Sequence, residues 1–301
     1  MQSGEHSLVV GTTEIDFTGP GTVESCVGQN TFLVGEVFAR GAPPAPLDGP
    51  EREAIADFIA TAPNVEIVAK DPAAQSMLDV AKTEVDAFAS AEIGVASEPL
   101  YHVRLPGDAH PQGGTQATGS LVAPVVAQSM ASKMEGTSGE LFIAVMNAGG
   151  VRSDLDGVVT VGDAYSTLPF GSTLVTMSLS GEALIAALQR NVENAYGISG
   201  VTFPYVANVR YSIDVTNAQA PQVVGVQVVT EDGTYQPIIS DASYNLVTTS
   251  YLAGGGDGYV FEGATDVVDT GHIDADALVQ YVESLPGGVV SPLPSLISLI
   301  E

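Results

Sequence analysis

Glycine and arginine residues interrupt the apolar pattern of the chain at residues 147–152, which read Asn-Ala-Gly-Gly-Val-Arg. The paired glycines allow backbone conformations that other residues avoid. Arg152 offers five N–H donors on a planar fork, which suit a carboxylate, a phosphate or the edge of a purine. A strand-to-loop turn with a surface arginine is the plain alternative, although the chain holds only six arginines. The segment therefore indicates a ligand contact that needs support from elsewhere in the chain.

Two further segments could supply that support. In residues 168–171, Leu-Pro-Phe-Gly, a proline fixes the backbone just before Phe170. Residues 254–258 hold four glycines around Asp257, which permits close backbone approach or a tight irregular turn. Phe170 and Tyr251 could together form an aromatic slot for a flat ligand, and two core aromatics are the alternative. A calcium loop is not favoured, because one aspartate among glycines supplies too few oxygen ligands.

Other chemistries find little support in the sequence. Cys26 is the single cysteine, so an internal disulfide cannot form, and we expect it to be a small buried residue. His102 and His110 flank Arg104 at a spacing that a small metal site could use, although a polar loop is the favoured interpretation. No Gly-x-Ser-x-Gly elbow is present to support a serine hydrolase.

The charge balance excludes two classes of partner. Asp and Glu number 36 against 9 Lys and Arg, which gives a net charge of −27. Because binding to phosphate depends on Lys and Arg, we expect neither nucleic acid nor an anionic membrane as a partner. The acidic surface suits either concentrated salt or general solubility, and the sequence leaves both open. Hydrophobic residues at 45% exclude a disordered chain, and no apolar run approaches the ~20 residues that cross a bilayer.

The elements that must position these residues differ between the two ends of the chain. The N-terminal part predicts a strand pair around a glycine turn, a helix opening near residue 49 and a linker helix opening at Asp71-Pro72. The remainder interleaves helices and strands, which favours an α+β fold: a mixed β-sheet with flanking helices. The expected strands are 8–17, 23–38, 141–146, 174–179, 209–215, 224–228 and 246–251; the expected helices are 120–134, 181–195 and 274–285. The apolar segment 289–300 is expected to be a packed terminus, and His272 to lie in a loop.

Taken in order, five motifs resemble the C-terminal domain of the 5′-nucleotidase family, which includes UDP-sugar hydrolases and ecto-5′-nucleotidases. They lie at 147–152, 157–163, 168–171, 179–181 and 254–259, and the resemblance covers about residues 93–265. In that family an N-terminal metallophosphatase domain holds two metal ions and performs hydrolysis, the C-terminal domain grips the nucleoside, and a helix links the two. The resemblance therefore implies a domain that recognises substrate.

The resemblance also implies roles for individual residues. Phe170 and Tyr251 would sandwich the base, Tyr251 standing where the family usually has phenylalanine. Asn147 would bond the edge of the base, Arg152 would reach the polar end of the substrate, and Asp257 would hold the ribose hydroxyls. The remaining implied substrate-binding residues are Gly150, Gly256 and Arg104. Arg104 departs from the family spacing, because residues 106–118 form an insertion before the next motif.

The metal-binding motifs of the catalytic domain are missing, since only four histidines occur and none sits in such a motif. The resemblance thus implies three parts: residues 1–66 as the end of a metallophosphatase domain, 67–94 as the linker helix, and 95–301 as the nucleoside-binding domain. We expect no catalytic residue and no cofactor in this chain, a divalent metal pair belonging to the missing domain. We therefore expect nucleoside binding without turnover.

Several alternatives stay open from the sequence. The chain could instead be a non-catalytic module that docks a separate phosphoesterase or a second copy of itself through its N-terminal strands. A periplasmic or extracellular location follows from the resemblance alone, because residues 1–6 carry no signal-peptide pattern. Base preference, and the choice among monophosphate, cyclic nucleotide and nucleotide sugar, are not determined.

Overall fold

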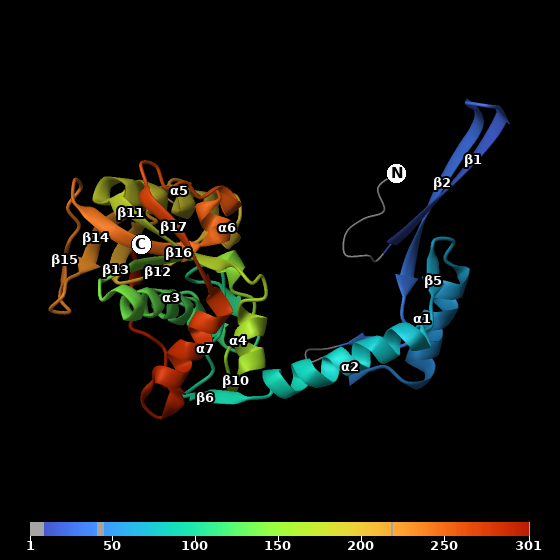
Figure 1. Ribbon diagram of the computed structural model, residues 1–301, viewed down its shortest axis with the longest axis horizontal. Helices are drawn as coiled ribbons and strands as arrows, with labels where there is room; N and C mark the ends of the chain where they lie inside the picture. The colour runs from blue at the N-terminus through green and yellow to red at the C-terminus, as the bar shows by residue number, and fades with distance from the viewer. Residues whose placement is uncertain (1–8, 41–44, 218, 301) are drawn as a thin grey trace. The chain divides into compact units, whose positions relative to one another are not determined.

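The computed structural model describes residues 9–40, 45–217 and 219–300, and it divides into two compact units (Figure 1). Unit 1 comprises Met1–Glu84 and unit 2 comprises Val85–Glu301. The division falls inside α2 (Pro72–Ala89), the helix expected from the Asp71-Pro72 signal. Asp71 caps this helix, as its carboxylate accepts the Ala74 N–H at 2.8 Å. The three functional parts inferred from the sequence stay a prediction.

Unit 1 is built on the expected strand pair. β1 (Val9–Gly19) and β2 (Thr22–Val34) form an antiparallel hairpin, and β5 (Val65–Ile67) runs parallel to β2. Gly21 adopts φ 80° in the connecting turn, which explains a glycine there. α1 (Gly49–Thr61) begins where the sequence predicts, and the short strands β3 (Ala39–Arg40) and β4 (Ala45–Pro46) pair before it. The second strand ends at Val34 and not at residue 38 as expected.

Few side chains of unit 1 are covered. The described helices α1 and α2 hold no buried residue, and Phe58 and Met77 are 71% and 77% exposed. Cys26 is also exposed, so the expectation of a small buried cysteine is wrong. Its strand belongs to a hairpin in which every residue of both strands is exposed or half-buried. The apolar residues of unit 1 follow the expected spacing, but their side chains are not buried within the unit.

Unit 2 confirms the α+β prediction of a mixed sheet with flanking helices. Its main sheet has the order β12-β9-β16-β11-β17, with β9 and β16 parallel and the other neighbours antiparallel. These strands are β12 (Pro204–Ala207), β9 (Ile143–Asn147), β16 (Ser243–Thr249), β11 (Thr173–Ser180) and β17 (Thr265–Ile273). α3 (Val122–Ser138) and α5 (Gly181–Gly197) lie on opposite sides of this sheet (Figure 1).

Two smaller sheets extend unit 2. One has the order β15-β14-β13-β19, and the other has the order β10-β6-β18. Their strands are β15 (Tyr235–Pro237), β14 (Gln222–Val229), β13 (Val209–Asp214), β19 (Ile297–Ile300), β10 (Val158–Thr160), β6 (Glu92–Ala96) and β18 (Val289–Val290). β19 pairs in parallel with β13, which confirms that the apolar tail is packed. The insertion at 106–118 contains a short hairpin, β7 (Ala109–His110) and β8 (Gly114–Thr115).

Shorter elements complete the unit and correct two expectations. β16 ends at Thr249, and α6 (Ser250–Ala253) follows, so Tyr251 lies on a helical turn and not at the end of a strand. The Thr249 hydroxyl caps this turn by accepting the Leu252 N–H at 3.3 Å. His272 lies within β17 and not in a loop. The remaining helices are α4 (Val161–Thr167), α7 (Asp274–Ser284), η1 (Ala148–Gly150), η2 (Gly200–Thr202), η3 (Gly256–Gly258) and η4 (Pro286–Gly288).

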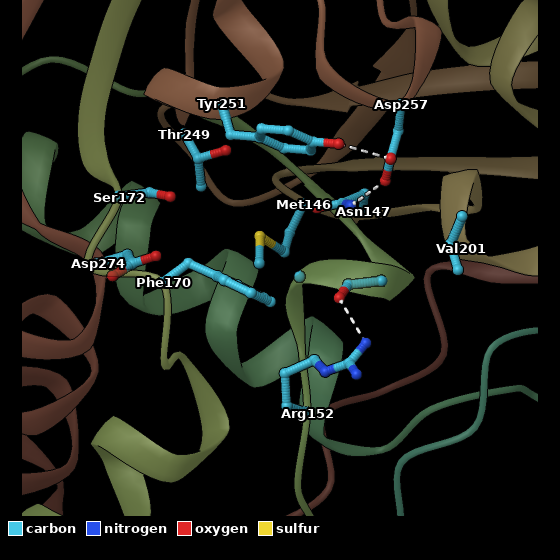
Figure 2. Close-up of a pocket in the computed structure, with 12 residues that line it drawn as sticks. Met146, Asn147, Arg152, Phe170, Ser172, Val201, Thr249, Tyr251, Asp257 and Asp274 are labelled. Atoms are coloured by element: carbon cyan, nitrogen blue, oxygen red, sulfur yellow. Dashed lines mark hydrogen bonds between the residues drawn. The ribbon is translucent and has the colours of Figure 1, made fainter. Parts of the chain in front are cut away.

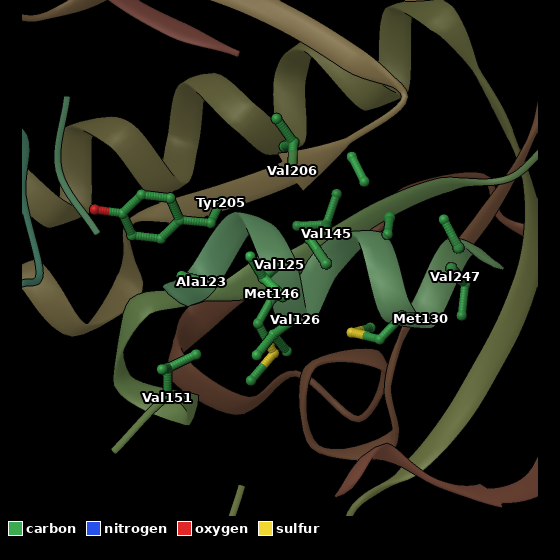
Figure 3. Packing of buried hydrophobic residues seen from close by; sticks show 14 of the residues in the cluster. Ala123, Val125, Val126, Met130, Val145, Met146, Val151, Tyr205, Val206 and Val247 are labelled. Atoms are coloured by element: carbon green, nitrogen blue, oxygen red, sulfur yellow. The ribbon is translucent and has the colours of Figure 1, made fainter. Parts of the chain in front are cut away.

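The core of unit 2 lies between α3 and the main sheet (Figure 3). Small and branched residues of α3, such as Val125 and Val126, are fully buried, and α3 packs on β9 and β12. Tyr205 is buried with its hydroxyl satisfied, since it accepts the Ser120 N–H at 2.7 Å and lies 3.1 Å from the Arg104 carbonyl. This core fixes the C-terminal end of β9, from which the site is built.

Candidate functional site

A cavity of about 440 Å³ opens at one edge of the main sheet (Figure 2). β9 and β16 are parallel and both end there, while the antiparallel β11 begins there and β17 ends there. The polar residues that follow or precede these strands therefore converge, as ligand sites in open sheets commonly do. The lining residues are Met146, Asn147, Gly149, Gly150, Arg152, Phe170, Ser172, Val201, Thr249, Tyr251, Asp257 and Asp274.

A hydrogen-bonded triad occupies one side of this cavity (Figure 2). Tyr251 Oη donates to Asp257 Oδ1 at 2.8 Å, and Asn147 Nδ2 donates to Asp257 Oδ2 at 2.6 Å. The hydrogen bond to Asp257 raises the pKa of the Tyr251 phenol above its ordinary value, with burial a smaller cause. Asp257 itself adopts φ 52°, an uncommon conformation for a residue with a side chain. The triad therefore joins the end of β9 to the segment 251–257, which lies more than 100 residues later in the sequence.

Glycines are required beside this triad for reasons of space. A Cβ on Gly256 would lie 2.5 Å from the ring of Tyr251, so the ring packs directly on the backbone of η3. A Cβ on Gly150 would lie 2.3 Å from Met146 Cε and 2.6 Å from Asn147 Oδ1. Gly256 thus allows the close approach that the sequence predicts. Gly150 is needed for space and not for an unusual backbone conformation as expected, since neither Gly149 nor Gly150 has a positive φ.

Phe170 and Arg152 lie together at another part of the cavity wall. The Arg152 guanidinium carbon is 5.9 Å from the centroid of the Phe170 ring, within reach of a cation–π contact. Arg152 Nη1 also donates to the Gly149 carbonyl at 3.4 Å. Phe170 and Tyr251 are 64% and 52% exposed. They are therefore not the two core aromatics that the sequence left as an alternative.

Arg104 does not line the described cavity. Every other expected substrate-binding residue that has a side chain does line it. Arg104 is exposed and absent from the lining residues, and it lies against Gly200, where a Cβ would be 3.1 Å from its own Cβ. Gly256 is also not among the lining residues, but it supports the Tyr251 ring. The insertion that follows Arg104 in the sequence forms the β7–β8 hairpin.

The two histidines near Arg104 are held in hydrogen-bonded contacts. His102 Nδ1 lies 2.9 Å from Ser120 Oγ, and burial is the main cause that lowers the pKa of His102 to about 4. His110 Nε2 lies 3.1 Å from Asp154 Oδ2, and Tyr101 stacks on the His110 ring with centroids 4.3 Å apart. Among the described residues no group of three or more His, Cys, Asp or Glu side chains could hold a metal. These residues do not fit a catalytic metal pair, and we derive no reaction step through one.

Sequence reasoning missed several lining residues, of which Asp274 is the most unusual. Its side chain is 2% exposed, and Oδ1 accepts the Ala275 N–H at 2.8 Å. Burial raises the pKa of this carboxyl group to about 6. Its backbone N–H donates to the Ser172 carbonyl at 2.9 Å, which joins α7 to the loop that carries Phe170. An acid at the start of a helix reads as an ordinary helix signal, so nothing in the sequence marked it as a wall of the site.

The other missed residues are Met146, Ser172, Val201 and Thr249, together with Gly149, which belongs to a predicted motif. Each is a small or apolar residue at the end of an element. Such residues carry no chemical signature in a sequence, and only the convergence of the strands places them on the cavity.

Comparisons with known proteins show the family of this chain. The 5′-nucleotidase C-terminal domain family matches residues 92–263. The probable 5′-nucleotidase of Treponema pallidum (strain Nichols) is 29% identical over 300 residues, which are 94% of this chain and 50% of that protein. The NAD 5′-nucleotidase of Haemophilus influenzae is 30% identical over 251 residues, covering 80% of this chain and 41% of that protein.

Solved structures give the same result. The NAD nucleotidase of Haemophilus influenzae superposes with a TM-score of 0.61 at 26% identity, covering 100% of this chain and 55% of that one. The 5′-nucleotidase precursor of Thermus thermophilus gives 0.62 at 27% identity, with 97% and 50% covered. This chain thus spans about half the length of these relatives. With the family matched over more than half of the chain and three of its five motifs contributing to one cavity, the protein belongs to the 5′-nucleotidase family, and residues 92–263 are its C-terminal domain.

Proposed function

We propose that unit 2 recognises the nucleoside part of the substrate of a 5′-nucleotidase-type phosphoester hydrolase. The observation that carries this proposal is the pair of exposed aromatic rings, Phe170 and Tyr251, on a cavity of about 440 Å³ that also holds a carboxylate, an amide and a guanidinium. Cavities of ~300–1,000 Å³ with few convergent polar groups are typical of sites for small molecules. A nucleoside offers the matching flat base and hydroxyl-bearing sugar.

Each polar group has a natural partner on such a ligand. The base would stack between Phe170 and Tyr251, and the Asn147 amide would bond to the edge of the base. The Asp257 carboxylate accepts hydrogen bonds only, so it suits sugar hydroxyls. Arg152 is the cation among the lining residues and suits the phosphate end of a nucleotide. In a chain with a net charge of −27, an arginine in this place also offsets repulsion of an anionic substrate.

Hydrolysis belongs to another part of the enzyme in this proposal. The relatives are about twice as long as this chain, and the described residues offer no metal cluster. A metallophosphatase domain with a divalent metal pair would supply the activated water, and this chain would hold the nucleoside in position. We therefore expect residues 1–301 alone to bind nucleosides without turning over nucleotides.

Calorimetric titration of adenosine into the purified chain tests the proposal. Stacking and a few hydrogen bonds, less the cost of immobilising the ligand, predict a dissociation constant between about 1 µM and 1 mM. The titration is done at low and at molar salt, because the acidic surface could require screening to fold fully. Saturable binding of adenosine, with no phosphate released from AMP, is the expected result. Absence of binding at every salt concentration would overturn the proposed function.

We also propose that the hairpin of unit 1 packs against the rest of the metallophosphatase domain, of which residues 1–66 would form the end. By the strand register Ile15 and Phe32 lie on the same face of the hairpin, and they are 45% and 51% exposed. Uncovered apolar faces mark interfaces. In a preparation of residues 1–301 alone, we expect copies of the chain to associate through this face. Sedimentation velocity between about 1 and 100 µM measures this association. The double variant Ile15→Ser/Phe32→Ser should associate less than wild type. A monomer at all concentrations would contradict an adhesive face.

A location outside the cytoplasm is part of the same proposal. It is supported by the related 5′-nucleotidase precursor of Thermus thermophilus and the snake venom 5′-nucleotidase of Naja atra, which is 24% identical over 229 residues. Within the described residues, no helix is long and apolar enough to cross a membrane.

A further inference from the structure

Tyr251 carries a hydroxyl that Phe170, the other aromatic residue of the cavity, lacks. This hydroxyl makes a hydrogen bond within the site. It donates to Asp257 Oδ1 at 2.8 Å, while Asn147 Nδ2 donates to Oδ2 at 2.6 Å (Figure 2). An ionised carboxylate offers about four lone-pair sites, two on each oxygen. One direction on each oxygen is therefore left for a ligand. Two free acceptor directions on neighbouring oxygens match the two hydroxyls of a vicinal diol.

The backbone of Asp257 needs support to hold the carboxylate in this place. Asp257 adopts φ 52° within η3, between Gly255 at φ 90° and Gly258 at φ 76°. Aspartate adopts this conformation more readily than most residues with a side chain, but it is still uncommon and is stabilised here by the surroundings. Tyr251 supplies part of that constraint, since its ring lies directly on Gly256 and its hydroxyl holds the Asp257 side chain. The ring and the hydroxyl therefore have separable effects.

We propose that the Tyr251 hydroxyl is a positioning group, which orients the Asp257 carboxylate toward a vicinal diol and so makes the site select ribonucleosides over nucleosides that lack the diol. The inference rests on the proposed function of the cavity. A phenylalanine in place of Tyr251 would stack on a base equally well, but it would leave the carboxylate held by Asn147 alone. A tyrosine hydroxyl keeps its proton at neutral pH and so stays a donor, and the hydrogen bond to Asp257 shifts its pKa further in that direction.

The test compares adenosine with 2′,3′-dideoxyadenosine, which has the same base and no diol, by calorimetric titration of the full chain. Wild type, Tyr251→Phe and a matched control, Tyr165→Phe, are used. Tyr165 Oη also donates to a carboxylate, Asp276, at 2.6 Å, and neither residue lines the cavity. The control thus loses the same kind of hydrogen bond away from the site.

We expect wild type and Tyr165→Phe to bind adenosine about 10-fold or more tightly than the dideoxynucleoside, since hydrogen bonds to a charged group are strong. Tyr251→Phe is expected to weaken adenosine binding about 5- to 20-fold and to change dideoxyadenosine binding by less than about 2-fold. The ratio of the two affinities would then fall toward one in Tyr251→Phe. This result would support the positioning role, because a purely structural role would weaken the binding of both ligands alike.

The possible failures are distinguishable. If Tyr251→Phe weakens both ligands equally, or leaves both unchanged, the positioning role of the hydroxyl is wrong while the nucleoside site stands. If wild type binds both ligands with equal affinity, Asp257 does not read the diol and the inference is overturned. If wild type binds neither ligand, the proposed function itself fails, and the inference fails with it.

Discussion

Replacing Phe170 by alanine is expected to lower the affinity of the chain for adenosine roughly 5- to 150-fold. Stacking of a base on an aromatic ring contributes about 1–3 kcal/mol, and this range converts to that loss of affinity. Phe170 is 64% exposed, so the ring costs little to remove from the fold. Its cation–π contact with Arg152, at 5.9 Å, would be lost as well, leaving the guanidinium less restrained. Calorimetric titration of wild type and variant measures the effect.

Phe58→Ala is the matched control for this prediction. Phe58 is 71% exposed, lies on α1 of unit 1 and does not line the cavity. It should leave adenosine affinity unchanged, and the thermal unfolding of both variants should stay close to that of wild type. An undiminished affinity in Phe170→Ala would show that the base does not stack on this ring. The base would then have to stack on Tyr251 alone.

The regular elements of unit 2 could be predicted because local signals and the buried pattern agree. Ser180 accepts the Ala183 N–H at 3.2 Å as the expected cap of α5, and the inward residues Leu184 and Leu188 are buried as predicted. The period-two pattern of 209–215 became β13, which alternates buried and less buried positions. Where one face of an element is covered by the same unit, periodicity in the sequence is a reliable guide.

The same reasoning failed where the covering surface is not in the unit. Cys26, Phe58 and Met77 belong to apolar patterns, yet they are exposed in the described structure. The spacing of apolar residues in a sequence indicates which face of a helix or strand is apolar, but it does not indicate what covers that face. The exposed side chains of unit 1 are therefore consistent with the docking proposal, and they explain why burial could not be inferred residue by residue.

The site was predictable only in its polar and aromatic members. Asn147, Gly150, Arg152, Phe170, Tyr251 and Asp257 all line the cavity as the motifs suggested, although their roles in binding stay predictions. The sequence could not indicate that Asn147 bonds to Asp257, because only the pairing of β9 with β16 brings these distant segments together. The bond from Tyr251 is local, and it depends on how α6 and η3 fold. Asp274 was missed for a related reason: its raised pKa comes from burial, which is a property of the packed structure.

The buried Asp274 carboxylate predicts an unusual dependence of stability on pH. Its pKa is raised from 3.8 to about 6, so between these values the folded state binds this proton more tightly than the unfolded state. The contribution of Asp274 to the free energy of unfolding is therefore largest at low pH and is lost as pH rises through about 6. Between pH 5 and 7.5 the loss amounts to about 1–1.5 kcal/mol.

Asp274→Asn isolates this contribution, because the amide has nearly the same shape and does not titrate. The free energy of unfolding of the variant, relative to wild type, should rise by about 1–1.5 kcal/mol between pH 5 and pH 7.5. Urea unfolding at both pH values measures it, and pH 5 keeps the protein above its isoelectric point near 4.1. Asp232→Asn serves as the control that should not change, because hydrogen bonds from Thr230 and Thr234 lower the pKa of Asp232 and keep it ionised throughout this pH range. If the relative stability of Asp274→Asn were the same at both pH values, the carboxylate would not be titrating in this window. Asp274 would then keep one charge state between pH 5 and pH 7.5, and any repulsion it exerts on a phosphate would not change over that range.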